Sequence, residues 1–256
     1  MFTRAIVRPP AANFSDGLTS AGLGAPDYEN ALRQHEAYCA VLAQSGLTVT
    51  KLAPDPAHPD SSFVEDTAIV TNRCAVITRP GAPSRRGEVD SMRLALADFF
   101  PELISIELPG TVDGGDVCEA GDHFYIGLSE RTNDMGAQQL SDLLTLSGYT
   151  CSFVDIRNTE GLLHLKSGLA HLAERRLVVT EALAGRAEFN GYDLIIVESH
   201  ESYAANCIRV NDHVLVAAGY PAFTGKLREL GYQVIELEMT EFQKMDGGLS
   251  CLSLRF

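Results

Sequence analysis

The chain has 256 residues, of which 45% are hydrophobic and 21% charged, so it has ample apolar material for a globular core. The formal net charge of −14 argues against nonspecific binding to nucleic acid or to an anionic membrane, because both need a basic surface. No apolar run approaches the roughly 20 residues of a membrane span, and we expect no signal peptide, because the N-terminus has no extended apolar segment.

Strand-like and helix-like segments alternate along the chain in a repeating order. Five strand-like runs each precede a longer segment. The runs lie at 4–9, 74–81, 121–127, 176–183 and 211–217. The longer segments, each of which ends in a second strand, lie at 31–52, 88–108, 136–156, 189–199 and 225–237. Leu140, Leu143 and Leu144 form a helical stripe, and Gly148 and Gly231 stand where a helix ends in a left-handed residue. We predict five strand–helix–strand units, with one doubly wound sheet as the alternative.

Short linkers between these units carry the polar residues of interest. They lie at 61–70, 110–121, 160–172, 201–210 and 244–254. If the five units surround an axis, the linkers occupy equivalent positions near it, and the last one pairs back against the first unit, which removes exposed sheet edges. This arrangement would gather Glu65, Asp66, Asp113, His164, Asn206 and Cys251 at one place.

A cysteine, a histidine and an acid that converge make a nucleophile, a base and a group that orients the base. His164 could transfer protons at neutral pH, and Asp113 could hold its imidazole in one orientation. Two further carboxylates, Glu65 and Asp66, would repel a thiolate unless the ligand is a cation. A planar guanidinium matches a carboxylate with two parallel hydrogen bonds, so the predicted site favours a guanidinium-like substrate.

Each of these residues also has a purely structural interpretation. Cys251 opens an expected C-terminal strand and could simply pack there, because a buried cysteine is often a small hydrophobe. Asn206 is equally compatible with a substrate contact and with a turn, and we expect Asp116 to support the Gly-Gly turn that follows Asp113. The six cysteines form no C-x-x-C motif, so we expect free thiols in a reducing, cytoplasmic compartment.

Seven stretches together resemble one enzyme family. They are DSSFVEDTAIV, TRPGAPSRRGE, GTVDGGDV, HFYIGLSERTN, LLHLKSGLA, ESYAANCI and DGGLSC, in chain order from 60 to 251. They look like the dimethylarginine dimethylaminohydrolase (dimethylargininase) family of the guanidine-modifying pentein superfamily. The resemblance implies a single catalytic domain over residues 1–256, an α/β fold that forms a five-bladed propeller of ββαβ-type units.

The resemblance also implies a reaction and its catalytic residues. The reaction is hydrolysis of Nω,Nω-dimethyl-L-arginine or Nω-methyl-L-arginine to L-citrulline plus dimethylamine or methylamine. Cys251 matches the nucleophile that forms a covalent adduct, and His164 matches the general acid and base. Asp113 matches the acid paired with that histidine, with a side chain shorter than the Glu that some relatives carry. No cofactor or metal is implied for turnover.

Further residues match substrate contacts of the family. Glu65 and Asp66 match guanidinium-binding acids, and Asp60, Arg85 and Arg131 match groups that hold the amino-acid end. Leu18 and Met245 match positions that touch substrate through backbone carbonyls, and residues 14–30 match a lid loop. The implied partner is a small cationic molecule, without nucleic acid or membrane, and a homodimer is left open.

Two rival functions are also compatible with these residues. The first is another guanidine-modifying enzyme on the same fold, such as an arginine deiminase, which would release ammonia from arginine. The second is a non-catalytic arginine-binding propeller, against which the joint presence of Cys251, His164 and Asp113 counts.

Overall fold

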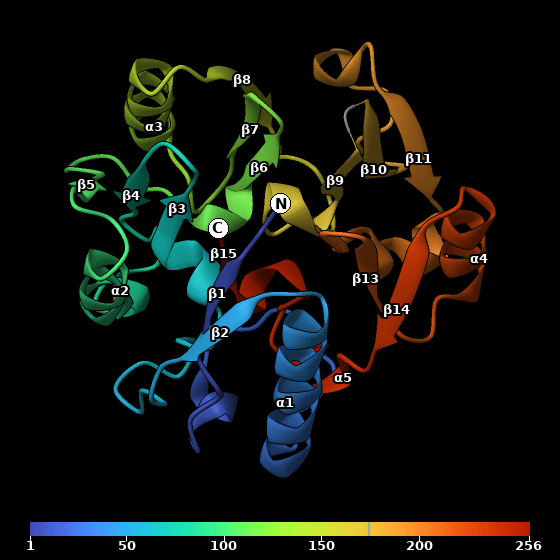
Figure 1. Cartoon of the computed structure of the whole chain (residues 1–256), viewed down its shortest axis with the longest axis horizontal. Helices are drawn as coiled ribbons and strands as arrows, with labels where there is room; N and C mark the ends of the chain where they lie inside the picture. Colours follow the sequence, from blue (N-terminus) through green and yellow to red (C-terminus); the bar gives the residue numbers. More distant parts are fainter. Residues whose placement is uncertain (174) are drawn as a thin grey trace. The chain divides into compact units, whose positions relative to one another are not determined.

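The computed structural model describes residues 1–173 and 175–256 (Figure 1). The chain divides into two compact units. The first unit comprises residues 1–64 and 206–256, and the second comprises residues 65–205. Within the described ranges, no helix is long and apolar enough to cross a membrane.

The first unit contains two three-stranded sheets. In one, β1 (Arg4–Val7) lies between β2 (Thr48–Lys51) and β15 (Leu254–Arg255), and helix α1 (Tyr28–Gln44) packs beside β2. The other consists of β12 (Ile208–Val210), β13 (His213–Ala217) and β14 (Gln233–Leu237), with helix α4 (Pro221–Glu229) and the short helix α5 (Thr240–Gln243). The C-terminal strand β15 pairs antiparallel with β1, as predicted for the last linker.

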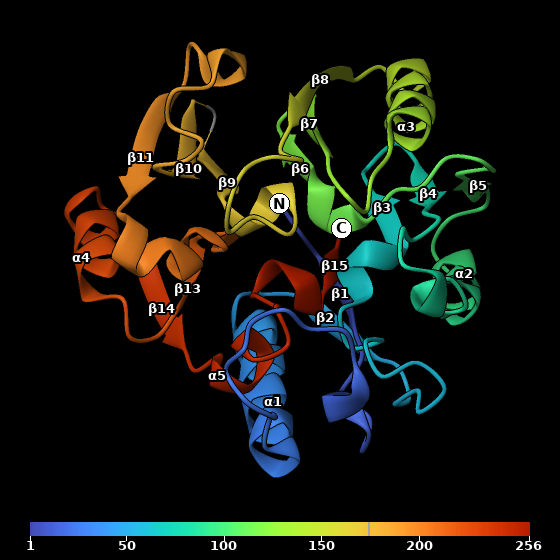
Figure 2. The same cartoon turned by 180° about the vertical axis from the view of Figure 1, so that it is seen from behind.

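The second unit contains three more sheets of three strands. The first has β3 (Ala68–Val70), β4 (Ala75–Ile77) and β5 (Ile104–Ser105), with helix α2 (Glu88–Ala97). The second has β6 (Val117–Ala120), β7 (His123–Leu128) and β8 (Thr150–Asp155), with helix α3 (Asp134–Leu146) against β7 and β8. The third has β9 (Leu169–Ala173), β10 (Arg176–Thr180) and β11 (Asp193–Val197), seen side by side in Figure 2.

All five sheets have the same topology. The middle strand pairs antiparallel with one neighbour and parallel with the other, as β7 does with β6 and β8. Because a parallel connection needs a crossover, a helix joins the parallel pair in four sheets, and the 3-10 turn Ala187–Phe189 lies between β10 and β11. The predicted five units are confirmed, and the alternative of one doubly wound sheet is wrong for the described residues.

Strand β7 shows why these segments fold as they do. Successive side chains of a strand point to opposite faces, and β7 is buried on both. Phe124 and Ile126 join the core that also holds Leu140 and Leu144 of α3, whereas Tyr125 joins a second core around β10. The predicted helical stripe therefore faces the sheet.

The helix ends follow local rules. The side chain of Asn133 caps the start of α3 by accepting a hydrogen bond from the Gly136 amide at 2.8 Å. Gly148 and Gly231 adopt φ values of 85° and 86°, the left-handed conformation predicted for both.

Candidate active site

The second unit holds a buried pair formed by His164 and Asp113. The imidazole Nε2 of His164 lies 3.1 Å from Oδ2 of Asp113, whose side chain is fully buried. The other oxygen of Asp113 accepts the amide of Gly81 at 2.8 Å, which fixes the carboxylate. The side chain of Asp113 therefore reaches the imidazole although it is one methylene shorter than that of Glu.

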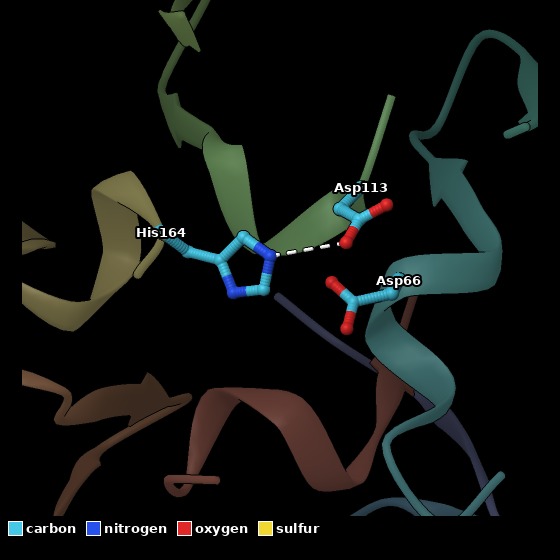
Figure 3. Close-up of side chains that lie close together, drawn as sticks. All are labelled: Asp66, Asp113 and His164. Atoms are coloured by element: carbon cyan, nitrogen blue, oxygen red, sulfur yellow. Dashed lines mark hydrogen bonds and ion pairs between the residues drawn. The ribbon is translucent and has the colours of Figure 1, made fainter. Parts of the chain in front are cut away.

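Asp66 completes a cluster of three side chains that point toward one another (Figure 3). It lies in the 3-10 turn Val64–Thr67, and its Oδ1 accepts the amide of Gly115 at 2.8 Å. A Cβ at position 115 would lie only 2.8 Å from Cγ of His164, so a glycine there allows the imidazole to approach.

The charges of this cluster set its protonation. Burial alone would lower the pKa of His164, but the carboxylates of Asp66, Asp116 and Asp113 outweigh it and raise the pKa to about 9. Burial likewise opposes ionisation of Asp66, but the charges of His164 and Arg85 lower its pKa to about 2. At neutral pH this arrangement holds a protonated imidazole beside ionised Asp66.

Arg85 is bound to two carboxylates of the same unit. Its guanidinium donates to Asp66 at 2.6 Å, and to both oxygens of Glu88 at 3.0 and 2.8 Å. All three side chains are buried. From the sequence we predict no role for Glu88, the first residue of α2. Its spacing of three residues from Arg85 is the one sequence signal that could have indicated the pair.

Glu65 makes an ion pair that sequence reasoning also missed. Its Oε1 lies 2.6 Å from Nζ of Lys166, in the turn that follows His164. The carboxylate predicted to bind a guanidinium thus already contacts one cation.

Arg131 lies in the connection between β7 and α3. Helix α3 begins at Asp134 with Asn133 as its cap, so Arg131 precedes the helix. Its amide donates to Oγ of Ser129 at 3.0 Å, and its backbone carbonyl lies where a Cβ of residue 81 would clash. A tight turn therefore fixes the backbone of Arg131.

Three predicted substrate contacts lie together in the first unit. Both carboxylate oxygens of buried Asp60 accept the amide of Leu18, at 3.0 and 3.2 Å. A Cβ at Gly17 would lie 2.4 Å from Oδ1 of Asp60 and 3.1 Å from Cε of Met245. Asp60 and Met245 thus lie against the backbone of Gly17, and Asp60 also binds the amide of Leu18, within the predicted lid loop.

Cys251 lies in the 3-10 turn Ser250–Leu252, so the expectation that it opens a strand is wrong, because β15 begins only at Leu254. Its half-buried Sγ accepts the amide of Gly248 at 3.4 Å. The turn thus presents the sulfur with a built-in donor.

Asn206 and Tyr38 hold this turn on both sides. The amide of Asn206 accepts from the Ser250 backbone at 2.9 Å and donates to the Ser250 hydroxyl at 3.1 Å. The hydroxyl of Tyr38 on α1 donates to the carbonyl of Leu249 at 3.0 Å. Of the two interpretations left open for Asn206, these contacts favour the turn.

The cluster of Asp66, Asp113 and His164 also has the composition of a metal site, since one ligand atom from each lies within 4.8 Å of the others. Those atoms already have partners, because His164 bonds Asp113 and Arg85 neutralises Asp66. The expectation of catalysis without metal stays a prediction.

Comparison with known proteins identifies the family. Over 257 residues the chain is 48% identical to the N(G),N(G)-dimethylarginine dimethylaminohydrolase of Pseudomonas aeruginosa, with 100% of both chains covered. The chain belongs to the dimethylarginine dimethylaminohydrolase family. A second member, from Streptomyces coelicolor, is 34% identical over 98% of this chain and 96% of its own length. No model of a known family matches the chain.

Solved structures agree with this assignment to the dimethylarginine dimethylaminohydrolase family. A cysteine-to-serine variant of the Pseudomonas aeruginosa protein in complex with citrulline matches with a TM-score of 0.97 at 47% identity, covering 100% of both chains. A histidine-to-glycine variant of a dimethylarginine dimethylaminohydrolase, in an adduct with S-methyl-L-thiocitrulline, matches equally well. The N-terminal domain of ArgZ matches with a TM-score of 0.85 at 20% identity, which shows the fold alone. The predicted pentein fold class is confirmed.

Proposed function

We propose that the chain hydrolyses Nω,Nω-dimethyl-L-arginine and Nω-methyl-L-arginine to L-citrulline, with release of dimethylamine or methylamine. The buried pair of His164 and Asp113, with Asp66 beside it, is the observation that carries the proposal in a chain of this family. The relatives bound to citrulline and to a thiocitrulline support the substrate class, because both ligands share the arginine-like skeleton.

In the first half of the proposed reaction, the thiolate of Cys251 attacks the guanidinium carbon and forms a C–S bond. The bond from this carbon to the substituted nitrogen then breaks, and its electron pair stays on nitrogen. His164 gives its proton to that nitrogen, so the amine leaves neutral. A pKa of about 9 suits this role, because it keeps the resting imidazole protonated at neutral pH.

In the second half, water attacks the carbon of the thiouronium adduct and gives one proton to the now neutral His164. The C–S bond breaks, its electron pair returns to sulfur, and the carbonyl of citrulline forms. The second proton of the water leaves to solvent, where the released amine takes it up. Asp113 holds the imidazole for both transfers and stabilises its charged form.

Substrate binding is assigned by the family match and by charge. We propose that Glu65 and Asp66 face the guanidinium, that Asp60 and Arg131 hold the amino-acid end, and that Leu18 and Met245 contribute backbone carbonyls. Arg85 was predicted to hold the amino-acid end as well. Its pairing with Asp66 and Glu88 favours a different role, in which it fixes the Asp66 carboxylate.

We propose that residues 1–256 act as one catalytic domain. The reaction requires Cys251, from the first unit, and His164 and Asp113, from the second. It uses only side chains and water, so no cofactor or metal is invoked.

We also infer a cytoplasmic location, because the free thiols of Cys39, Cys74, Cys118 and Cys151 are typical of a reducing compartment. The net charge of −14 favours a small cationic substrate over nucleic acid or an anionic membrane. The homodimer left open by the sequence would be tested by light scattering in solution.

The test is product analysis with purified protein. Dimethylarginine and arginine are supplied separately, and citrulline, alkylamine and ammonia are measured. We expect citrulline and dimethylamine from dimethylarginine, and none in a Cys251→Ser variant, whereas Cys151→Ser, at another half-buried thiol, keeps full activity. Citrulline and ammonia mainly from arginine would indicate a deiminase, and saturable binding without product would indicate a non-catalytic binder.

A further inference from the structure

Asp116, which the proposed mechanism does not use, lies at the centre of the second unit's polar network. It ends the 3-10 turn Gly114–Asp116 and is fully buried. Its Oδ1 accepts the amide of Leu165 at 3.0 Å, and its Oδ2 accepts the hydroxyl of Ser129 at 2.6 Å. One carboxylate thus joins two segments that are far apart in the sequence.

The first of these bonds acts on the residue that follows His164. It holds the backbone where the 3-10 turn Leu165–Ser167 begins, and His164 is the cap of that turn. The approach is close, because a Cβ at Gly127 would lie 2.9 Å from Cβ of Leu165 and 3.1 Å from Oδ1 of Asp116. A shift of Asp116 would therefore move the backbone from which the imidazole projects.

The second bond acts on the turn that contains Arg131. Oγ of Ser129, which donates to Asp116, also accepts the amides of Arg131 and Thr132, both at 3.0 Å. The hydroxyl of Thr132 in turn accepts the amide of Asp113 at 3.1 Å. The turn that carries Arg131 is therefore built on the same carboxylate as the turn that carries His164.

We propose that Asp116 is a positioning residue, which rests on the proposed function: its carboxylate sets the His164 turn and the Arg131 turn in fixed relation. It thereby couples the placement of the proton donor to the placement of a group that holds the substrate. A misplacement of about 1 Å at such a position can cost about 100-fold in rate.

The charge of Asp116 adds to this role. Three carboxylates of the second unit, Asp66, Asp113 and Asp116, act on His164 and raise its pKa against the effect of burial. Burial raises the pKa of Asp116 itself to about 6, opposed by His164 and by hydrogen bonds from Ser129 and Thr132. At neutral pH Asp116 is therefore mostly ionised and favours the protonated imidazole.

The test uses Asp116→Asn, which keeps the size of the side chain, removes the charge and leaves one acceptor oxygen for two donors, the Leu165 amide and the Ser129 hydroxyl. We expect kcat for dimethylarginine to fall about 100-fold. In the profile of kcat against pH, the decline on the alkaline side should move to lower pH. NMR of the imidazole should show His164 losing its proton at lower pH than in the wild type. An unchanged pH profile with an unchanged His164 titration would overturn the proposal.

A second variant, Ser129→Ala, removes the hydroxyl that donates to Asp116 and accepts the amides of Arg131 and Thr132, but keeps the bond from the Leu165 amide to Asp116. We expect it to raise KM and to shift the alkaline limb of the pH–rate profile and the His164 titration less than Asp116→Asn does, because loss of the Ser129 hydrogen bond raises the pKa of Asp116 but keeps its carboxyl group. A fall of kcat as large as that of Asp116→Asn, without any rise in KM, would overturn the coupling of the two turns. The NMR titration needs no turnover, so failure of the proposed activity is distinguished from failure of this inference.

Discussion

His164 makes the stability of the protein depend on pH in a direction that the structure fixes. Its pKa is raised from 6.5 to about 9 in the folded chain. The protonated imidazole therefore stabilises the fold below pH 6.5, and this contribution is lost as pH rises through 9. This rise in pKa corresponds to roughly 3 kcal/mol of stability at full effect, most of which remains at pH 7 and almost none at pH 10.

The assay compares the wild type with His164→Gln by urea unfolding at pH 7 and pH 10. Circular dichroism follows the transition, because the chain has no tryptophan. We expect the difference in the free energy of unfolding, wild type minus variant, to fall by roughly 2 kcal/mol between the two pH values. His200→Gln, at an exposed histidine, should give a constant difference. A difference that stays constant or grows with pH for His164→Gln would refute the reasoning.

Three further substitutions test the second unit. Glu88→Gln removes one of the carboxylates that pair with buried Arg85, so we expect the free energy of unfolding in urea to fall by roughly 3 kcal/mol. An unchanged urea midpoint would contradict this. Lys166→Met removes the cation next to Glu65, and the KM for dimethylarginine should fall about fivefold, for a pair worth about 1 kcal/mol. A KM that rises would show that the lysine helps binding. Gly115→Ala puts a Cβ against the imidazole and should destabilise the fold by about 1–3 kcal/mol and abolish citrulline release; full activity would contradict the close approach.

Much of the fold could be predicted because it rests on local patterns. The stripe of Leu140 and Leu144 and the glycines at 148 and 231 each report the conformation of their own segment. The 3-10 turn at Cys251 was missed, because it depends on bonds that Ser250 makes with Asn206, 44 residues away. A strand-like composition after a Gly-Gly pair does not reveal such a partner.

The candidate site was predictable as a set of residue types and less so as a set of contacts. Asp113 and His164 were paired from the family pattern, and they lie at hydrogen-bond distance. The pairing of Glu65 with Lys166 joins residues 101 positions apart, so no local periodicity could have pointed to it. For Asp116 the sequence indicates only a turn residue, because a sequence does not show that a carboxylate has two distant donors.

The central claim is that Cys251 forms a covalent bond to the guanidinium carbon of a methylated arginine. The most direct measurement is rapid acid quenching of the enzyme during turnover of dimethylarginine, followed by peptide mass spectrometry. We predict an adduct on the peptide that contains Cys251, with no adduct and no citrulline in Cys251→Ser. Citrulline production by that variant, or an adduct on another cysteine, would contradict the account.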